Sequence, residues 1–389
     1  MIYLKNMGIG DMFKNVFSSA NSSVLGIDIG SSAIKIVQLK KQDGKAVLET
    51  YGELALGPYS KLEVGQASHL SMIQTVEAMN DLLNEKEVAV TTKDCGVAIP
   101  VLSSFMAFIE MPEASDKDLQ NMIPIEARKY IPIPIAEVTL SWSIIPKDKV
   151  KSGEVDIEEK SGEKTAKKID VLVIAIHNDV VSKYRDILDK TGLEASFLEI
   201  EAFSTIRAVV ENHDKPQMII DFGASTTKVY MVERGILKIS HTINRGSQDI
   251  TTALAKSMNI SIKRAEVLKR TRGLSGGTLS EDYTEETRAQ FIEASSTVID
   301  YIFSEAKRVL ATFRRGEGKN VERVVLSGGG SILDGFKELA EKSFETEVKY
   351  ADPFSKVDAP AFLVDVLSES GPEFAVALGL ALRKLEELG

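Results

Sequence analysis

The feature that most constrains this fold is a short segment that occurs twice in the sequence. Residues 24–39 read VLGIDIGSSAIKIVQL, and residues 218–232 read MIIDFGASTTKVYMV. Each copy has an apolar stretch, a turn rich in glycine and hydroxyl groups, and a second apolar stretch, which together predict a β-hairpin. The copies align without gaps at an offset of 193 residues, so that Asp28 matches Asp221. This repeat predicts two similar halves that face each other.

The turns of the two hairpins carry the residue types of a phosphate site. Backbone N–H groups of a glycine turn converge on an anion, while hydroxyl groups and a lysine add donors and positive charge. A single Gly-Ser turn is more often an ordinary turn, but two matched copies can hold a polyphosphate from both sides. The residues predicted to bind it are Gly30, Ser31, Ser32 and Lys35 in the first hairpin and Gly223, Ser225, Thr226, Thr227 and Lys228 in the second.

An aspartate precedes each turn, at Asp28 and Asp221. We expect both carboxylates near the cleft between the halves, where they can hold Mg²⁺ through water, because this ion gives up its hydration shell reluctantly. The alternative is that each aspartate caps its own turn. The four histidines show no spacing typical of metal ligands, so Mg²⁺ is the one metal that the sequence predicts.

A third glycine-rich segment, Ser-Gly-Gly-Gly-Ser, lies at 327–331 after a predicted strand at 321–326, and it is expected to open a helix. Without side chains the backbone can approach a bulky ligand closely, and the start of a helix offers free N–H groups. A flexible connection is the alternative. The predicted ligand contacts are Gly328, Gly329, Gly330 and Ser331.

Composition narrows the class of protein. The 47 basic and 57 acidic residues leave a formal net charge of −10, which argues against a general nucleic-acid or anionic-membrane binder. The single cysteine, Cys95, excludes an internal disulfide and indicates a reducing compartment, so the cytoplasm is the expected location. The apolar runs fall short of the roughly 18–20 residues that cross a bilayer.

The element pattern predicts an interrupted first half. Helices are expected at 71–84 and 115–130, and strands at 95–100, 104–109, 138–145 and 169–176, with Ile144 among the inward residues of its strand. Helices dominate 246–315, and an apolar helix is expected at 372–388. The predicted domains are an amphipathic N-terminal segment (1–22), the first half (23–102 and 193–216), an inserted α/β module (103–192), the second half (217–366) and a C-terminal helix of the first half (367–389).

In order and spacing, the two hairpins and the Gly-Gly-Gly segment resemble the phosphate-one, phosphate-two and adenosine motifs of the actin-like ATPase superfamily. The resemblance covers nearly the whole chain from about residue 23 and implies a two-lobed α/β fold that binds ATP with Mg²⁺. It also implies that Glu266 and Lys269, three residues apart on a helix, contact the ribose and base. From charge alone these two residues belong to the solvated face of a basic helix.

The segment at 200–203, Ile-Glu-Ala-Phe, resembles the connecting helix on which some of these ATPases carry a water-orienting acid. It nominates Glu201 as the catalytic candidate, and the alternative is a carboxylate that stabilises the start of a helix through the helix dipole. Hydrolysis needs a positioned water as well as a bound nucleotide, so the resemblance implies slow turnover at most.

A narrower resemblance comes from residues 126–134, EARKYIPIP, followed by the strand at 138–145. They resemble the inserted subdomain of the PilM family of type IV pilus assembly, whose layout is similar to the division protein FtsA. This implies an ATP-binding adaptor at the cytoplasmic face of the inner membrane, which docks the N-terminal cytoplasmic tail of a PilN-like membrane protein. It leaves self-association and contacts with other pilus assembly proteins open.

Two other functions compete with this interpretation. A sugar or acid kinase of the superfamily typically uses an Asp in the connecting region, yet 196–207 contains only Glu199 and Glu201 as acids. An FtsA-like filament protein usually ends in a basic amphipathic membrane helix, whereas 383–389 is short and mixed in charge. Both alternatives are therefore less favoured.

Overall fold

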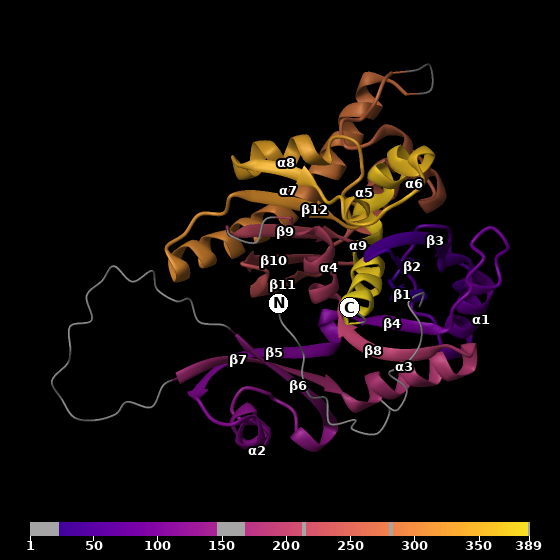
Figure 1. Cartoon of the computed structure of the whole chain (residues 1–389). Helices are drawn as coiled ribbons and strands as arrows, with labels where there is room; N and C mark the ends of the chain where they lie inside the picture. The colour runs from indigo at the N-terminus through magenta and orange to yellow at the C-terminus, as the bar shows by residue number, and fades with distance from the viewer. Residues whose placement is uncertain (1–22, 146–167, 212–214, 280–282, 388–389) are drawn as a thin grey trace. The chain divides into compact units, whose positions relative to one another are not determined.

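The computed structural model describes residues 23–145, 168–211, 215–279 and 283–387 (Figure 1). They fall into two compact units, of which one comprises the described residues of 100–185 and the other those of 23–99 and 186–387. The predicted amphipathic segment at 1–22 and nearly all of the charged stretch at 147–168 lie outside the described residues.

The larger unit contains two five-stranded sheets of the same topology. Their strand orders are β3-β2-β1-β4-β8 and β11-β10-β9-β12-β13. In each, the first strand of the repeated hairpin pairs antiparallel with the second and parallel with a later strand. The strands are β1 (Ser23–Ile29), β2 (Ala33–Gln42), β3 (Lys45–Ala55), β4 (Asp94–Ile99), β8 (Glu194–Ile200), β9 (Gln217–Phe222), β10 (Thr227–Glu233), β11 (Ile236–Ile243), β12 (Arg323–Ser327) and β13 (Glu347–Tyr350).

The helices of this unit are α1 (Met72–Leu83), α4 (Glu201–Val209), α5 (Ser247–Ser257), α6 (Ile262–Arg272), α7 (Glu285–Glu317), α8 (Phe336–Phe344) and α9 (Val364–Glu387). α1, which lies within the range of 71–84 expected from the sequence, starts at a capping box formed by Ser71 and Gln74. The prediction for α9 is wrong at its start, because the helix begins eight residues before Pro372 and continues through it. Tertiary contacts override the local signal here: the carbonyl of Pro372 accepts hydrogen bonds from the Gly328 N–H (2.8 Å) and the Ser327 hydroxyl (3.1 Å).

Close backbone packing holds α9 against the first sheet and α4. A Cβ on Gly26 of β1 would lie 1.9 Å from the Ala377 carbonyl oxygen, and one on Gly379 would lie 2.0 Å from the Ser204 carbonyl oxygen. In the second sheet, β9 and β10 pack on α5, α7 and α8 through an apolar cluster in which Phe222 stacks on Phe336 at 4.8 Å. These cores fix the ends of β1 and β9, and with them Asp28 and Asp221.

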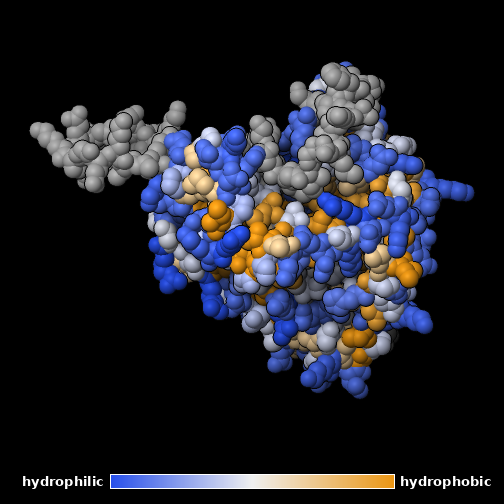
Figure 2. Space-filling view, turned by 90° about the horizontal axis from the view of Figure 1, so that it is seen from below, coloured by the Kyte–Doolittle hydropathy of each residue, from blue (hydrophilic) through white to orange (hydrophobic). Residues whose placement is uncertain are grey.

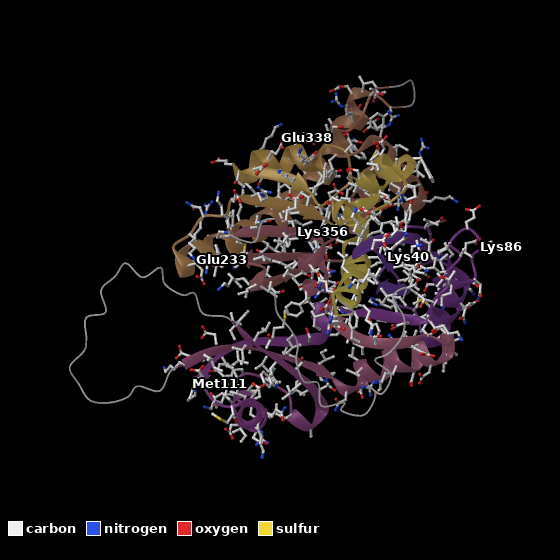
Figure 3. The ribbon with its side chains drawn as sticks, in the orientation of Figure 1. Lys40, Lys86, Met111, Glu233, Glu338 and Lys356 are labelled. Carbon is white, nitrogen blue, oxygen red and sulfur yellow. The ribbon has the colours of Figure 1, made fainter. Side chains whose placement is uncertain are left out.

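The smaller unit has one antiparallel sheet of order β5-β7-β6, comprising β5 (Ser104–Pro112), β7 (Lys168–His177) and β6 (Val138–Ile145). α2 (Asp116–Ala127) covers one face through apolar residues that include Met111 of β5, which is labelled in Figure 3. α3 (Asn178–Thr191) follows β7. The simple alternation expected in β6 is wrong, because Ile144 is 39% exposed while Ser141 and Ser143 are buried. Figure 2 shows apolar residues gathered in patches on the face seen from below.

Candidate functional site

A cavity of about 460 Å³ in the larger unit brings together the two hairpin turns and the triple-glycine segment. Its walls come from both hairpins, the start of α4, helix α6, the triple-glycine segment and α9. The predicted site residues that line it are Asp28, Gly30, Ser31, Ser32, Lys35, Glu201, Asp221, Gly223, Thr226, Lys228, Glu266, Lys269, Gly328, Gly329 and Gly330.

The two hairpin turns face each other and have the same local geometry. The Gly30 N–H donates to the Ala33 carbonyl at 3.0 Å, and the Gly223 N–H donates to the Thr226 carbonyl at 3.0 Å. The turns also touch, since the Ser225 hydroxyl donates to the Ser31 hydroxyl oxygen at 3.0 Å. The repeat in the sequence is therefore a repeat in space, and residues of both bends line one cavity.

Three predicted ligand contacts do not line the cavity. Ser225 is turned to the opposite bend. The Thr227 hydroxyl donates to the Arg245 carbonyl at 2.8 Å, and the Ser331 hydroxyl donates to the Gly328 carbonyl at 2.7 Å. The last two hydroxyls hold the surrounding loops in shape.

In the first hairpin the lysine is drawn to acids from other elements. Lys35 stands opposite Asp28 in the β1–β2 register, but its ammonium lies 3.3 Å from Glu373 of α9 and 3.7 Å from Glu53 of β3. Desolvation in the cleft, together with the neighbouring carboxylate of Glu201, raises the pKa of Asp28 to about 7. Asp28 therefore changes charge near neutral pH.

In the second hairpin the lysine stays with its own aspartate. Lys228 stands opposite Asp221 in the β9–β10 register. Its ammonium lies 3.5 Å from the Asp221 carboxylate and 3.1 Å from the Glu201 carboxylate. Burial opposes the charge of Lys228, but these two carboxylates outweigh it and raise the pKa of the ammonium.

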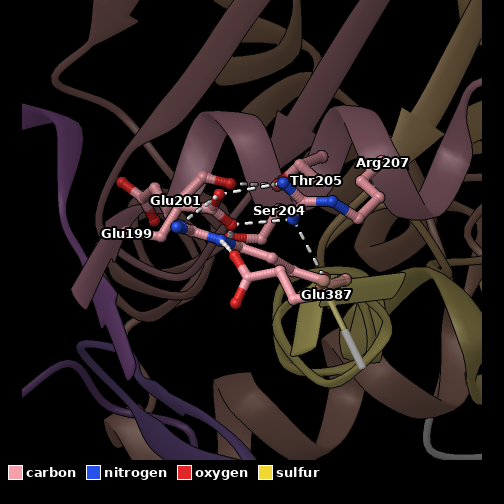
Figure 4. A network of polar contacts seen from close by, with 8 residues as sticks. Glu199, Glu201, Ser204, Thr205, Arg207 and Glu387 are labelled. Atoms are coloured by element: carbon pink, nitrogen blue, oxygen red, sulfur yellow. Dashed lines mark hydrogen bonds and ion pairs between the residues drawn. The ribbon is translucent and has the colours of Figure 1, made fainter. Parts of the chain in front are cut away.

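The two glutamates of the connecting segment have different surroundings (Figure 4). Glu199 is buried and binds Arg207 at 2.8 Å and Arg383 at 3.0 Å, and although burial acts in the opposite direction, these guanidinium groups lower its pKa. Glu201 is the first residue of α4 and lines the cavity. The far end of α4 is fixed by Lys356 (Figure 3), whose ammonium donates to the carbonyls of Arg207 and Val210.

Helix α6 places Glu266 and Lys269 on the wall of the cavity. Both side chains are buried, and they form an ion pair of 2.7 Å. The Glu266 carboxylate also accepts hydrogen bonds from the Thr251 hydroxyl (2.6 Å) and the Arg270 Nε (2.7 Å). The alternative that these two residues belong to a solvated helix face is therefore wrong.

The triple-glycine segment approaches the end of β9 more closely than any other residue type allows. Gly328 has φ +82°, and a Cβ there would lie 2.5 Å from Asp221 Oδ1. The Gly330 N–H donates to the Phe222 carbonyl at 2.8 Å. The expectation that this segment opens a helix is wrong, because α8 begins only at Phe336, after a series of turns.

A loop at 63–68 joins the first turn to the second half and carries no motif that could have revealed it. The Ser68 N–H donates to the Ser31 carbonyl at 2.8 Å, and the Ala67 N–H donates to the Gln248 side chain of α5 at 2.7 Å. Gly65 lines the cavity, where a Cβ would lie 2.7 Å from Glu266 Oε1. Glu53 and Glu373 were also missed, since only the folded chain brings them to Lys35.

The donor set suits a hard divalent cation such as Mg²⁺. Among the described residues no three His, Cys, Asp or Glu side chains are grouped as a metal site. Acidic side chains outnumber basic ones on the cavity wall, so a bound cation would reduce their repulsion. The acids are Asp28, Glu53, Glu201, Asp221, Glu266, Asp334 and Glu373, and the bases are Lys35, Lys228, Lys269 and Arg270.

Comparison with known proteins identifies the family. The profile described as "Type IV pilus assembly protein PilM" matches residues 26–385. The chain belongs to the PilM family. A solved structure described as the "PilM-PilN type IV pilus biogenesis complex" is similar with a TM-score of 0.75 and 25% identity, covering 93% of this chain and 98% of the other.

More distant relatives of this PilM-family chain agree with the fold. The ethanolamine utilization protein EutJ from Carboxydothermus hydrogenoformans has a TM-score of 0.53 and 16% identity, covering 95% of this chain and 91% of the other. Cell division protein FtsA of Neisseria meningitidis serogroup B is 24% identical over 92% of this chain and 90% of the relative. The predicted actin-like two-lobed fold with an inserted α/β subdomain is confirmed. Within the part of the chain that the structure describes, we find no helix with the length and apolar character to span a bilayer.

Proposed function

We propose that this PilM-family protein is an ATP-binding adaptor of the type IV pilus assembly complex. The observation that carries the nucleotide part is the pair of matched glycine turns, which meet through Ser31 and Ser225 at the edge of one cavity. Two converging sets of backbone N–H groups suit a polyphosphate. Membership of the PilM family supports the pilus part.

Different residues of the cavity contact different parts of the bound ATP. The backbones of the two turns, with Lys35, bind the phosphates, and Asp28 and Asp221 hold Mg²⁺ through water. Glu266 and Lys269 contact the ribose and base, while Gly328 to Gly330 allow the nucleoside to lie against the backbone. When bound, Mg²⁺ neutralises phosphate charge. The role of this chain is to bind and orient the nucleotide, with turnover by Glu201 slow at most.

Calorimetric titration of the full chain with ATP and Mg²⁺ tests this site. We expect saturable binding, which Gly223→Val abolishes because a Cβ at this turn would lie 2.9 Å from the Thr226 carbonyl oxygen. Gly316→Val is the matched control, since a Cβ there meets nothing within 4 Å. No binding by the folded wild-type protein would refute the nucleotide site. Phosphorylated product from a panel of sugars and short acids would favour a kinase, and ATP-dependent light scattering would favour an FtsA-like filament.

The partner we propose is the N-terminal cytoplasmic tail of a PilN-like inner-membrane protein, docked on the inserted subdomain at 103–192. A PilM-PilN complex is the structure with the TM-score of 0.75 given above. β5 lies at an edge of the small sheet and exposes Phe105 (36%) and Phe108 (43%), which offers backbone groups and apolar contacts to an extended peptide. Such docking would hold the protein at the cytoplasmic face of the inner membrane.

Fluorescence anisotropy with a labelled tail peptide tests the docking. We expect Phe108→Ser to weaken binding at least about tenfold, the effect of losing one well-packed aromatic contact. Phe362→Ser is the control, because this side chain is 81% exposed in the larger unit. Removal of the charged stretch at 147–168 should leave binding intact. An equal loss of peptide affinity in the two Phe variants would contradict the docking site. So would a loss of affinity that occurs only when the charged stretch is removed.

A further inference from the structure

Lys228 points at carboxylates, although the sequence suggests a contact with phosphate. Its ammonium lies 3.1 Å from Glu201 Oε2 and 3.5 Å from Asp221 Oδ2, and its side chain is 15% exposed. Glu201 and Asp221 are more buried still, at 8% and 9%. An ion pair this well shielded from water is expensive to break.

The origin of this contact is built into two elements of the fold. β10 brings Lys228 opposite Asp221, and α4 begins at Glu201 with the carboxylate directed into the same cavity. The far end of α4 is held by the Lys356 ammonium, and its middle packs on α9 at Gly379. Glu201 therefore cannot leave Lys228 by a shift of the helix as a whole without breaking those contacts.

We propose that Lys228 is a positioning residue that holds the Glu201 carboxylate in an ion pair and so keeps bound ATP from being hydrolysed. This inference rests on the proposed nucleotide site. A carboxylate orients an attacking water by accepting its hydrogen bond. The Lys228 ammonium fixes the orientation of the Glu201 carboxylate through Oε2, and its positive charge weakens any hydrogen bond that the carboxylate accepts from a water.

The aligned lysine of the first hairpin shows that this contact is specific to the second. Lys35 binds Glu53 and Glu373. Loss of Lys228 therefore removes this ion pair from Glu201, whereas loss of a lysine outside the cavity leaves it in place. Lys319 provides the matched control, because its ammonium pairs at 2.6 Å with Glu233, at the other end of β10 and outside the cavity.

Single-turnover hydrolysis and ATP affinity, measured on the full chain with Mg²⁺, separate the possibilities. We expect Lys228→Met to hydrolyse ATP at least about tenfold faster than wild type while its dissociation constant stays within about threefold. Adding Glu201→Gln should remove the gain, and Lys228→Arg, which retains the charge, should restore the low rate. Lys319→Met should hydrolyse like wild type.

Several outcomes would overturn the inference. A folded Lys228→Met protein that binds ATP without a faster rate contradicts it, and so does a gain that persists with Glu201→Gln. If wild type binds ATP and folded Lys228→Met does not, Lys228 is a phosphate ligand, which refutes the inference and leaves the proposed function standing. If wild type binds no ATP, the proposed function itself fails.

If Lys228→Met does not fold, a crystal structure of the wild-type protein provides a second test. In crystals of the wild-type protein grown with a non-hydrolysable ATP analogue and Mg²⁺, we expect the Lys228 ammonium to remain within hydrogen-bond distance of Glu201. An ammonium that has moved to the phosphates would overturn the inference.

Discussion

The two hairpins of the cavity have the same sequence pattern and the same register, but their lysines have different partners. In both, an aspartate at the end of the first strand stands opposite a lysine of the second strand. Lys35 binds acids from β3 and α9, whereas Lys228 binds Asp221 and the first residue of α4. Strand register thus places the groups, and distant elements decide how they pair.

The surroundings of the two aspartates differ as well. The pKa of Asp28 rises to about 7 through desolvation and the nearby carboxylates of Glu201 and Asp221, with Lys35 and Lys228 acting against this rise. Asp221, by contrast, has the Lys228 ammonium within 3.5 Å. We therefore expect the charge that the first hairpin presents to Mg²⁺ to depend on pH.

The largest expected effect is a loss of Mg-ATP affinity when the aspartate of the second hairpin is replaced. Asp221→Ala should weaken Mg-ATP binding about 100-fold or more, because it removes a carboxylate that the Lys228 ammonium holds in place on the cavity wall. Folding should suffer far less, since Lys228 keeps Glu201 as a partner. Calorimetry at pH 7 measures the affinity, and Asp28→Ala should lose less than Asp221→Ala. Unchanged affinity in a folded Asp221→Ala protein would count against the metal assignment.

The next effect concerns the lysine of the first hairpin. Lys35→Met leaves Glu53 and Glu373 close together without their shared cation, and it should lower the free energy of unfolding by about 2–3 kcal/mol. Urea denaturation at pH 8 measures this loss. Lys45→Met is the control, because Lys45 forms a solvent-exposed pair with Asp358 at 3.0 Å and should lose no more than about 0.5 kcal/mol. Similar losses in the two variants would show that the Lys35 network does not differ from a surface pair.

The smallest effect is a change in pH dependence. The pKa of Asp28 is raised from 3.8 to about 7, so between these values the folded chain keeps a proton that the unfolded chain releases. This contribution is fully present below about pH 4 and is lost as the pH rises through 7. Asp28→Asn should therefore be more stable than wild type at pH 8, by about 1–3 kcal/mol without nucleotide, and the difference should shrink towards pH 5.

Urea titrations at pH 5 and pH 8 check this pH effect, with Asp43→Asn on an exposed turn as the control. A stability difference that is the same at both pH values would show that Asp28 does not titrate in this range.

The sequence was sufficient for the parts of the fold that local patterns determine. The repeated hairpins could be predicted because each aspartate, Asp28 or Asp221, and its glycine turn lie within a stretch of about 15 consecutive residues. The start of α9 was missed because Pro372 is a strong local signal for a helix start, which contacts with Gly328 and Ser327 override. The triple glycine was expected to open a helix, but it meets the end of β9 instead.

Most residues of the site could be predicted from the sequence, but the ion pairs between them could not. Glu53, Gly65 and Glu373 reach the cavity from three separate elements, and no short-range pattern connects them to Lys35 or Glu266. For the same reason, the sequence could not distinguish the partners of Lys35 from those of Lys228. Long-range contacts of this kind depend on the packing of whole sheets and helices.

The proline within α9 has a mechanical consequence. The Pro372 carbonyl accepts hydrogen bonds from Ser327 and Gly328 of the second half. Further along the same helix, Ala377 packs on β1 and Gly379 packs on α4, both of which belong to the first half. Pro372 also deprives the helix of one internal hydrogen bond at this step. We therefore expect any change in the width of the cavity to bend the C-terminal helix near Gly371 and Pro372.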